Sequence, residues 1–414
     1  MSLPHAPEPD VTLAFLREGY PFVRSRCARL GADGFKARLS LQPVTFVSGR
    51  AAAEMFYAPG RFTRRGAMPV TTLTLLQDRG SVQALDGEAH RQRKALWMRL
   101  AASEEAVGDL SSRFEKAFAR RAERWKTAPP AGLVLHDEAR WALTEAACEW
   151  VGLPQEGAEL EQRKKEFSAM IDGAGSFGGA QLRGQILRQR SERWARGVMA
   201  PVLQDPSRAA EGSPLRMLAE HRDADGQPLD ETSAVVELLN TLRPAVAVAR
   251  FVAFAALELH KHPEWKSRLR EDEAMIRPFA QEVRRLSPFF PVIAGRVLKP
   301  FSWRGEDFAE EDWVILDLYG TNRDPAACEA PEEFRPERFA DWPGDAYAMA
   351  PQGAGPYETT HRCPGERATI ALMEAALRVL IAQDYVLPEQ DLRVKLTRFP
   401  ALPGSGIVIK PAAG

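Results

Sequence analysis

A glycine-rich loop that leads into a cysteine at the start of a helix is the feature that most constrains this chain. The loop runs from Pro351 to Glu366 and reads PQGAGPYETTHRCPGE. Glycines let a backbone approach a flat ligand, and the N–H groups and dipole of a helix start stabilise a thiolate. Such a thiolate is a good axial ligand for haem iron, although a lone cysteine is more commonly buried and inert. The loop alone leaves both interpretations of Cys363 open.

The composition is that of an ordinary globular protein. The chain has 414 residues, of which 45% are apolar and 27% charged, so a disordered or fibrous chain is excluded. Its formal net charge of -1 gives no reason to expect nucleic acid or an anionic membrane as a partner. Four scattered cysteines without a C-x-x-C pair favour a reducing cytoplasm over a disulfide framework. We find no signal core and no stretch apolar enough for a membrane anchor.

Helical periodicity dominates, and strand patterns are few. We expect one domain over residues 1–414, mainly α with a small β-sheet region set to one side, because the chain has no internal repeat and no low-complexity linker. The main helices are expected at about 137–151, 181–200, 231–260, 278–286 and 365–383. Strands are expected at 44–47, 292–297 and 313–318, with a C-terminal hairpin over 399–409.

Two further motifs precede the cysteine loop. Glu282 and Arg285 form E-x-x-R on a predicted helix, and FRPERF follows at 334–339. The order E-x-x-R, F-x-P-x-R-F, glycine-rich Cys-x-Gly loop and final helix resembles the cytochrome P-450 superfamily. The resemblance implies a single-domain P-450 fold that binds haem b (iron protoporphyrin IX), with Cys363 as the metal ligand. It also implies that Glu282, Arg285 and Arg338 form a structural ion-pair network.

The central helix departs from the general pattern of that superfamily. Typical members carry an acid and a threonine there, which deliver protons to iron-bound dioxygen, whereas this helix has Arg243-Pro244 followed by neither. Proline inside a helix costs about 3 kcal/mol. Arg243 has mostly apolar neighbours, so we expect it to be buried rather than on the surface, where arginine usually lies. A buried guanidinium needs an anion, and a substrate carboxylate would supply one in bidentate geometry.

The cysteine loop departs as well. It is longer than usual between Gly355 and Cys363, and Gln352 stands where the superfamily has phenylalanine. With Leu-Arg-Pro in the central helix, the loop resembles that of the bacterial fatty-acid peroxygenases, and segments 80–94, 318–322 and 402–406 are similar to theirs. This resemblance implies hydroxylation of long-chain fatty acids at Cα or Cβ with hydrogen peroxide and without a redox partner protein.

The same resemblance assigns roles to individual residues. Arg243, Pro244 and Gln83 are expected to be catalytic, with the substrate carboxylate held by Arg243 as the general acid–base group. Gln83 is expected to lie over the haem near Cα and Cβ. Hydroxylating members have glutamine at this position, and the member type that makes terminal alkenes has histidine.

The remaining assignments concern the cofactor and the substrate pocket. His90 and Lys94, spaced i, i+4, are expected to hold a haem propionate, and Arg64 is a weaker candidate. A solvated helix face is the common alternative for such a pair. Phe289 and Phe290 are expected to line the substrate pocket, with core packing as the alternative.

Three other functions remain open: a decarboxylase that gives terminal alkenes, a conventional reductase-dependent monooxygenase, and a haem-containing carrier or sensor of fatty acids. The missing acid and threonine argue against the monooxygenase. Arg250, seven residues after Arg243, has no assigned role.

Overall fold

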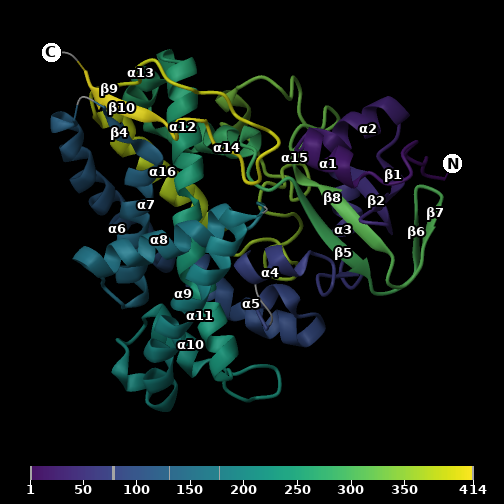
Figure 1. Ribbon diagram of the computed structural model, residues 1–414, viewed down its shortest axis with the longest axis horizontal. Helices are drawn as coiled ribbons and strands as arrows, with labels where there is room; N and C mark the ends of the chain where they lie inside the picture. Colours follow the sequence, from purple (N-terminus) through teal and green to yellow (C-terminus); the bar gives the residue numbers. More distant parts are fainter. Residues whose placement is uncertain (1, 77–79, 130, 177, 413–414) are drawn as a thin grey trace.

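The computed structural model describes residues 2–76, 80–129, 131–176 and 178–412. Most of the helices occupy one part of the molecule, and the largest sheet with α1–α3 lies at the other end (Figure 1). The α-helices are α1 (Thr12–Glu18), α2 (Phe22–Leu30), α3 (Arg50–Phe56), α4 (Val70–Leu76), α5 (Gly87–Ala101), α6 (Glu104–Ala122), α7 (Leu135–Val151), α8 (Gly157–Gly173), α9 (Gly179–Gln204), α10 (Pro214–Glu220), α11 (Glu231–Ala247), α12 (Ala249–Lys261), α13 (Glu264–Glu271), α14 (Ile276–Leu286), α15 (Leu318–Thr321) and α16 (Glu366–Ala382).

Five strands form the largest sheet, in the order β1-β2-β8-β5-β3. Only β2 and β8 are parallel, with Phe46 opposite Ile315, and the other neighbours are antiparallel. Smaller sheets have the orders β4-β10-β9 and β6-β7. The strands are β1 (Gly34–Leu39), β2 (Gln42–Ser48), β3 (Phe62–Thr63), β4 (Leu133–Val134), β5 (Val292–Val297), β6 (Phe301–Trp303), β7 (Glu306–Phe308), β8 (Trp313–Asp317), β9 (Tyr385–Val386) and β10 (Val408–Pro411). The mainly α fold with a small sheet region is confirmed.

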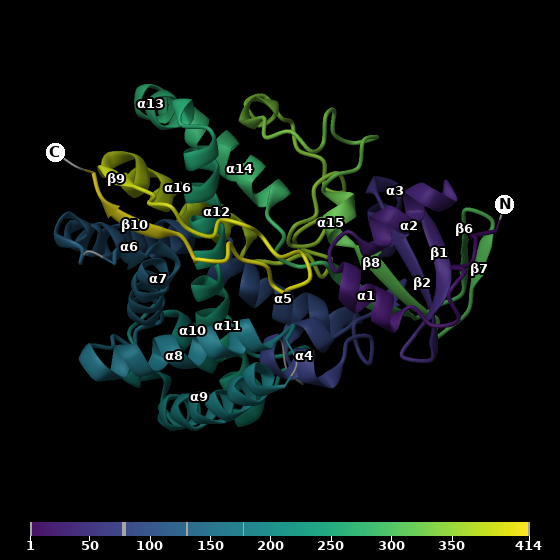
Figure 2. The same cartoon turned by 45° about the horizontal axis from the view of Figure 1, so that its top comes forward.

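The helical core forms around α11 and α12, which run through the middle of the molecule in both views (Figures 1 and 2). Both helices are buried on nearly every side: α11 packs against α7 and α9, and α12 packs against α7 and α16. Burying a leucine or phenylalanine side chain contributes about 1.5–3 kcal/mol, so these central helices hold the helical part together. The Asp230 carboxylate caps the start of α11 by accepting from the Ser233 N–H at 2.9 Å.

The single helix expected over 231–260 is divided into two helices. α11 ends at Ala247 and α12 begins at Ala249. The interruption falls at Val248, whose N–H donates to the Ala245 carbonyl in a tighter turn. Pro244 lies one turn earlier, and its missing N–H removes a regular i to i−4 bond. The proline therefore lies one turn before the point where the regular hydrogen bonding of the helix is interrupted.

Two other expectations also need correction. The helix expected at 181–200 is longer, because α9 begins at Gly179 and continues through Pro201 to Gln204. The C-terminal hairpin over 399–409 does not form, since β10 pairs with β4 and β9 instead. Pro403 and Gly404 lie where regular pairing within the segment would be needed, and proline cannot donate to a strand ladder.

Candidate active site

The cysteine loop folds back on itself just before α16. The Cys363 N–H donates to the Gln352 carbonyl at 3.0 Å. The Gln352 side-chain amide donates to Thr369 Oγ1 at 3.0 Å and lies 3.8 Å from Cys363 Sγ. Gly353 has φ +97°, and a Cβ there would approach the Tyr57 hydroxyl to 2.7 Å. The loop is thus held in one shape that admits no side chain at Gly353.

Buried ion pairs fix this loop to two helices. Arg362 donates to both carboxylate oxygens of Glu366, at 2.8 and 3.0 Å, and to the Gly355 carbonyl at 3.1 Å. Arg284 of α14 donates to Glu366 at 2.7 Å. Burial opposes ionisation of Glu366, but the two guanidinium groups outweigh it and lower the pKa of that carboxyl. The loop is therefore cross-linked to α14 and α16.

The thiol of Cys363 is under opposing influences. Burial raises its pKa, while the Lys94 ammonium, the Gly365 N–H and the Gln352 amide act in the opposite direction. Burial wins, so the pKa is raised, whereas the loop pattern alone suggested a stabilised thiolate. A buried thiol of this kind loses its proton when it coordinates a metal ion.

Lys94 and His90 extend from α5 to the same loop. The Lys94 ammonium donates to the carbonyls of Thr360, at 3.0 Å, and Arg362. The His90 ring lies 4.2 Å from the ring of His361, which bonds the Leu85 carbonyl through Nε2 at 3.0 Å. Burial lowers the pKa of Lys94 to about 8 and that of His90 to about 4. Both side chains are buried, so the solvated helix face is excluded.

Arg64 is buried beside the loop. It donates to the Ala294 carbonyl at 3.0 Å, and its guanidinium lies over the rings of Phe56 and Tyr57. Burial lowers the pKa of Arg64. Its neighbour Arg65, rather than Arg64, forms the ion pair with Asp86 at 2.8 Å.

These residues fit a haem group. Arg64, His90 and Lys94 form a basic cluster, and no carboxylate of the described residues lies within ion-pair distance of them. The buried cations of this cluster, Arg64 and Lys94, suit the two propionates of a haem, and the neutral His90 ring beside them can donate a hydrogen bond. The adjoining loop offers the Cys363 sulfur, which becomes a thiolate on binding iron. Cys363 would hold the iron, and the basic cluster would hold propionate.

Arg243 is buried on α11, with 2% of its surface exposed. Its Nη2 donates to Asn240 Oδ1 at 2.6 Å and to the Leu76 carbonyl at the end of α4. The interpretation of Arg243 as a surface residue is therefore wrong. Pro244, the next residue, is exposed even though it lies within α11.

Gln83 lies in a short 3-10 turn, Val82–Ala84, just before α5. The fully buried carboxylate of Glu237 accepts from the Val82 N–H at 2.8 Å and from Arg93 at 2.9 Å. Since Glu237 belongs to α11, this carboxylate fixes the turn that carries Gln83 to the helix that carries Arg243. The contact had no signal in the sequence, because Val82 donates through its backbone.

The two phenylalanines occupy different environments. Phe289 is 8% exposed and packs 5.0 Å from Phe251 of α12, as part of the main core. Phe290 is 37% exposed and meets Phe289 edge-on at 4.7 Å. Phe289 thus fits the core-packing alternative. Phe290 has the larger exposed fraction of the two side chains.

The predicted ion-pair network is present. Arg285 donates to both oxygens of Glu282 at 2.7 Å, and Arg338 donates to Glu282 at 3.2 Å. Sequence reasoning missed the second network of Arg284, Arg362 and Glu366, and it gave no role to Tyr57 or His361. The HRC tripeptide before the loop's end was the one signal that pointed to His361 and Arg362.

Comparison with known proteins identifies the family to which the chain belongs. The cytochrome P-450 family model matches residues 247–390. A solved structure of cytochrome P450SP alpha (CYP152B1) in complex with (R)-ibuprophen has a TM-score of 0.93 and 39% identity, and the match covers 97% of this chain and 98% of that one. The chain belongs to the cytochrome P-450 family, and it is a haem-thiolate oxidoreductase that binds haem b.

Further structures place it within that family. P450EX alpha (CYP152N1) with myristic acid has a TM-score of 0.92 at 35% identity, and a variant of OleT in complex with arachidonic acid has 0.93 at 30% identity. Each match covers 99% of this chain and 98% of the other. The fatty-acid peroxygenase group suggested by the motifs is thereby confirmed.

Curated relatives match over a shorter range. (+)-Menthofuran synthase of Mentha piperita is 33% identical over 136 residues, which are 30% of this chain and 27% of that protein. The chain thus matches about a quarter of the length of that relative. None of the described helices is both long and apolar enough to cross a bilayer.

Proposed function

We propose that this enzyme uses hydrogen peroxide to hydroxylate long-chain fatty acids at Cα or Cβ, with the substrate carboxylate bound by Arg243 as the general acid–base group. The observation that carries the proposal is a buried guanidinium beside a proline within the central helix, with neither an acid nor a threonine after it. The solved relatives that carry myristic acid and arachidonic acid support the substrate class.

Arg243 performs two tasks in this proposal. Its planar guanidinium binds the carboxylate through two parallel N–H···O bonds, which fixes the position of the first carbons of the chain. It also keeps the carboxylate close to the peroxide. Cα and Cβ are then the carbons within reach, so placement determines where oxidation occurs.

Proton transfer is assigned to the bound carboxylate. It takes the proton from the peroxide oxygen that is to be retained and returns a proton to the oxygen that leaves as water. The haem-thiolate group supplies the oxidising chemistry when peroxide binds, aided by electron donation from Cys363. Gln83, held near α11 by Glu237, would line the space beside Cα and Cβ.

Two alternatives remain as outcomes of the test. Decarboxylation to a terminal alkene is less favoured because Gln83 stands where alkene-forming relatives have histidine. A monooxygenase that needs a reductase is less favoured because the central helix lacks the acid and the threonine. We further propose that no redox partner protein is needed and that the enzyme works in the cytoplasm, where its four unbridged cysteines would stay reduced.

A decoy experiment tests the mechanism. A short acid such as heptanoate would occupy Arg243 and leave room for a small non-acid such as guaiacol. Peroxide should oxidise guaiacol only when heptanoate is present, and Arg243→Ala should remove this dependence. The measurement is the rate of guaiacol oxidation against heptanoate concentration. A rate that does not respond to heptanoate in the unmodified enzyme would contradict the proposal, because the protein would then supply its own acid–base group.

A further inference from the structure

A second buried cationic cluster lies away from the cysteine loop, where α7, α8 and α12 meet. Asp172 Oδ1 accepts from Arg140 and from Arg250, each at 2.6 Å. Arg250 is 1% exposed, and its Nε and Nη1 are buried without a hydrogen-bond partner among the described residues. Arg140 Nε and His136 Nε2 are in the same state. One carboxylate therefore serves two guanidinium groups, and several donors remain unsatisfied.

A cavity of about 250 Å³ opens beside this cluster. Arg140, Ser168 and Asp172 line it, and Lys164, Lys165 and Arg183 surround it. Ser168 is 9% exposed, and its hydroxyl oxygen, like Arg140 Nε, is buried without a partner in the described part of the chain. Arg140 and Ser168, which both belong to the cavity lining, thus each carry a donor that no group of the described residues satisfies.

The charges around the cavity do not balance. Lys164 binds Asp137 at 2.7 Å, Lys165 binds Glu161 at 2.6 Å, and Asp172 is shared by two arginines. Arg183, on the side formed by α9, adds another cation. Cations therefore outnumber carboxylates, so the cavity favours an anion, and the planar groups favour an oxyanion that accepts several hydrogen bonds.

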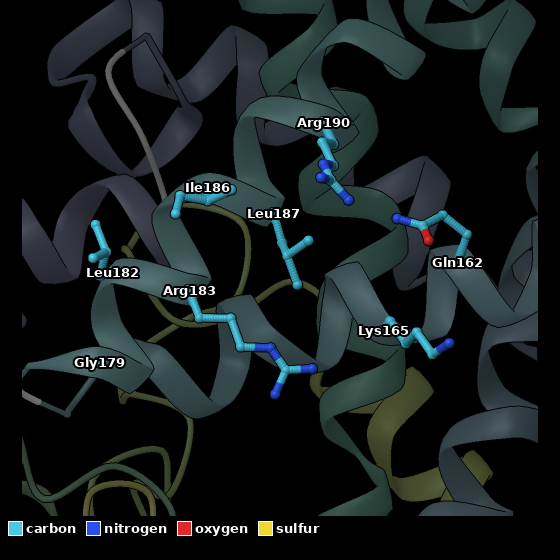
Figure 3. Close-up of a pocket in the computed structure, with 8 residues that line it drawn as sticks. All are labelled: Gln162, Lys165, Gly179, Leu182, Arg183, Ile186, Leu187 and Arg190. Carbon is cyan, nitrogen blue, oxygen red and sulfur yellow. The ribbon is translucent and has the colours of Figure 1, made fainter.

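An apolar groove continues from the cavity. It lies between α8 and α9, has a volume of about 350 Å³, and shares Lys165 and Arg183 with the cavity. Arg183 and Leu187 of α9 point toward the side of α8 that carries Gln162 and Lys165 (Figure 3). Leu182 and Ile186, also in its lining, are 62% and 48% exposed, so the groove presents apolar surface to solvent.

We propose that the cavity and groove together bind a second long-chain carboxylate on the outside of α8 and α9. The carboxylate would accept from Arg140 and Ser168 beside Arg183, and the acyl chain would cover Leu182 and Ile186. An inorganic anion would accept hydrogen bonds from the donors but leave the apolar groove exposed. A neutral lipid would cover the groove but leave the donors without an anion. The choice of a fatty acid as ligand rests on the proposed function, but the site is separate from the one at Arg243.

The test counts bound myristate in the haem-loaded enzyme. Equilibrium dialysis with radiolabelled myristate reports all bound molecules, whereas the haem absorption spectrum reports only the molecule near the iron. We expect dialysis to find a second bound molecule per chain that the spectrum does not detect. Arg183→Glu and Ile186→Asp should each remove that molecule and leave the spectral titration unchanged. Both residues lie at the surface, so the variants should fold.

Controls separate this inference from the proposed function. Arg193→Glu changes an exposed arginine of α9 outside the groove and should keep the second molecule. Arg243→Ala should lose the spectral response and keep the dialysis signal of the outer site. Equal stoichiometry by dialysis and by spectrum in the unmodified enzyme would overturn the inference. So would a second molecule that persists in both groove variants, or one that inorganic phosphate displaces but that Ile186→Asp does not weaken.

Discussion

The cysteine loop and the central helix place their functional groups by different means. The loop is held by bonds to three helices: Lys94 of α5, Arg284 of α14 and Glu366 of α16 all bind it. The central helix instead interrupts its own backbone next to the site, with Pro244 inside α11 and a break at Val248. One side fixes a ligand by adding contacts. The central helix carries the Arg243 guanidinium on a backbone that lacks some of its regular hydrogen bonds.

The difference separates what is common to the family from what is particular to this group. A haem ligand must be held in every member, so the loop side relies on general devices: glycines, buried ion pairs and a helix start. In the proposed function, the Arg243-Pro244 pair serves one substrate class. Changes on the loop side should therefore affect cofactor and fold, and changes on the helix side should affect turnover alone.

The largest effect is expected for Cys363→Ala. Without the thiolate, the reduced, carbon-monoxide-bound spectrum should lose its haem-thiolate signature, and peroxide-dependent turnover should fall to background. The measurements are that spectrum and product formation from myristate. Cys328→Ala is the matched control and should leave both unchanged, and an unaltered spectrum in Cys363→Ala would refute the assignment of the ligand.

Arg243→Ala should come next, with turnover reduced about 100-fold or more, since two charge-assisted hydrogen bonds are lost. Haem content should stay near that of the unmodified enzyme, because the Arg243 guanidinium donates to Asn240 and to the Leu76 carbonyl, both outside the cysteine loop. Pyridine haemochrome analysis and initial rates at saturating acid are the measurements. Arg243→Lys should recover part of the rate, and full activity in Arg243→Ala would move the acid–base role elsewhere.

Glu366→Gln should reduce stability by about 3–5 kcal/mol at neutral pH, because it breaks a buried pair of charges. The folded protein holds the pKa of Glu366 below its ordinary 4.5. Its contribution is therefore present above that value and is lost as pH falls through the lower, folded-state pKa. Thermal unfolding between pH 7 and pH 3 should show the variant and the unmodified enzyme converging at acid pH. The exposed Glu358→Gln should show no such difference.

The smallest effect is expected for Gln83→His, which should shift the ratio of alkene or Cβ product to Cα product by about twofold to fivefold, a change worth less than about 1 kcal/mol. Total turnover and haem content should change little. Product analysis by gas chromatography measures the ratio. An unchanged ratio would mean that Gln83 only borders the pocket.

The sequence predicted the parts of the site whose signals are local. Cys363 lies in the same short loop as Gly353 and Gly355, Glu282 and Arg285 are one helical turn apart, and Arg243 stands among apolar residues. The contact from Lys94 to the Thr360 carbonyl spans 266 positions and uses a backbone acceptor, so no residue pattern reports it. The helix break could not be located either, because surrounding packing decides whether a proline kinks, ends or merely interrupts a helix.

Arg250 shows the same limit more sharply. Its partner Asp172 lies 78 positions earlier, and Arg140, which shares that carboxylate, lies on another helix again. A search of its own helix for a partner could not succeed. Because the carboxylate that binds Arg250 lies on another helix, the sequence around Arg250 does not identify it.

The contact between Lys94 and the loop carbonyls has a consequence for protein engineering. The cysteine loop places His361 against His90 and directs the carbonyls of Thr360 and Arg362 to Lys94. The loop and α5 should therefore be exchanged together when segments are moved between family members. A chimera that moves residues 351–366 alone into another family member would leave carbonyls without their ammonium donor, whereas one that also carries 87–101 would bring the donor with it.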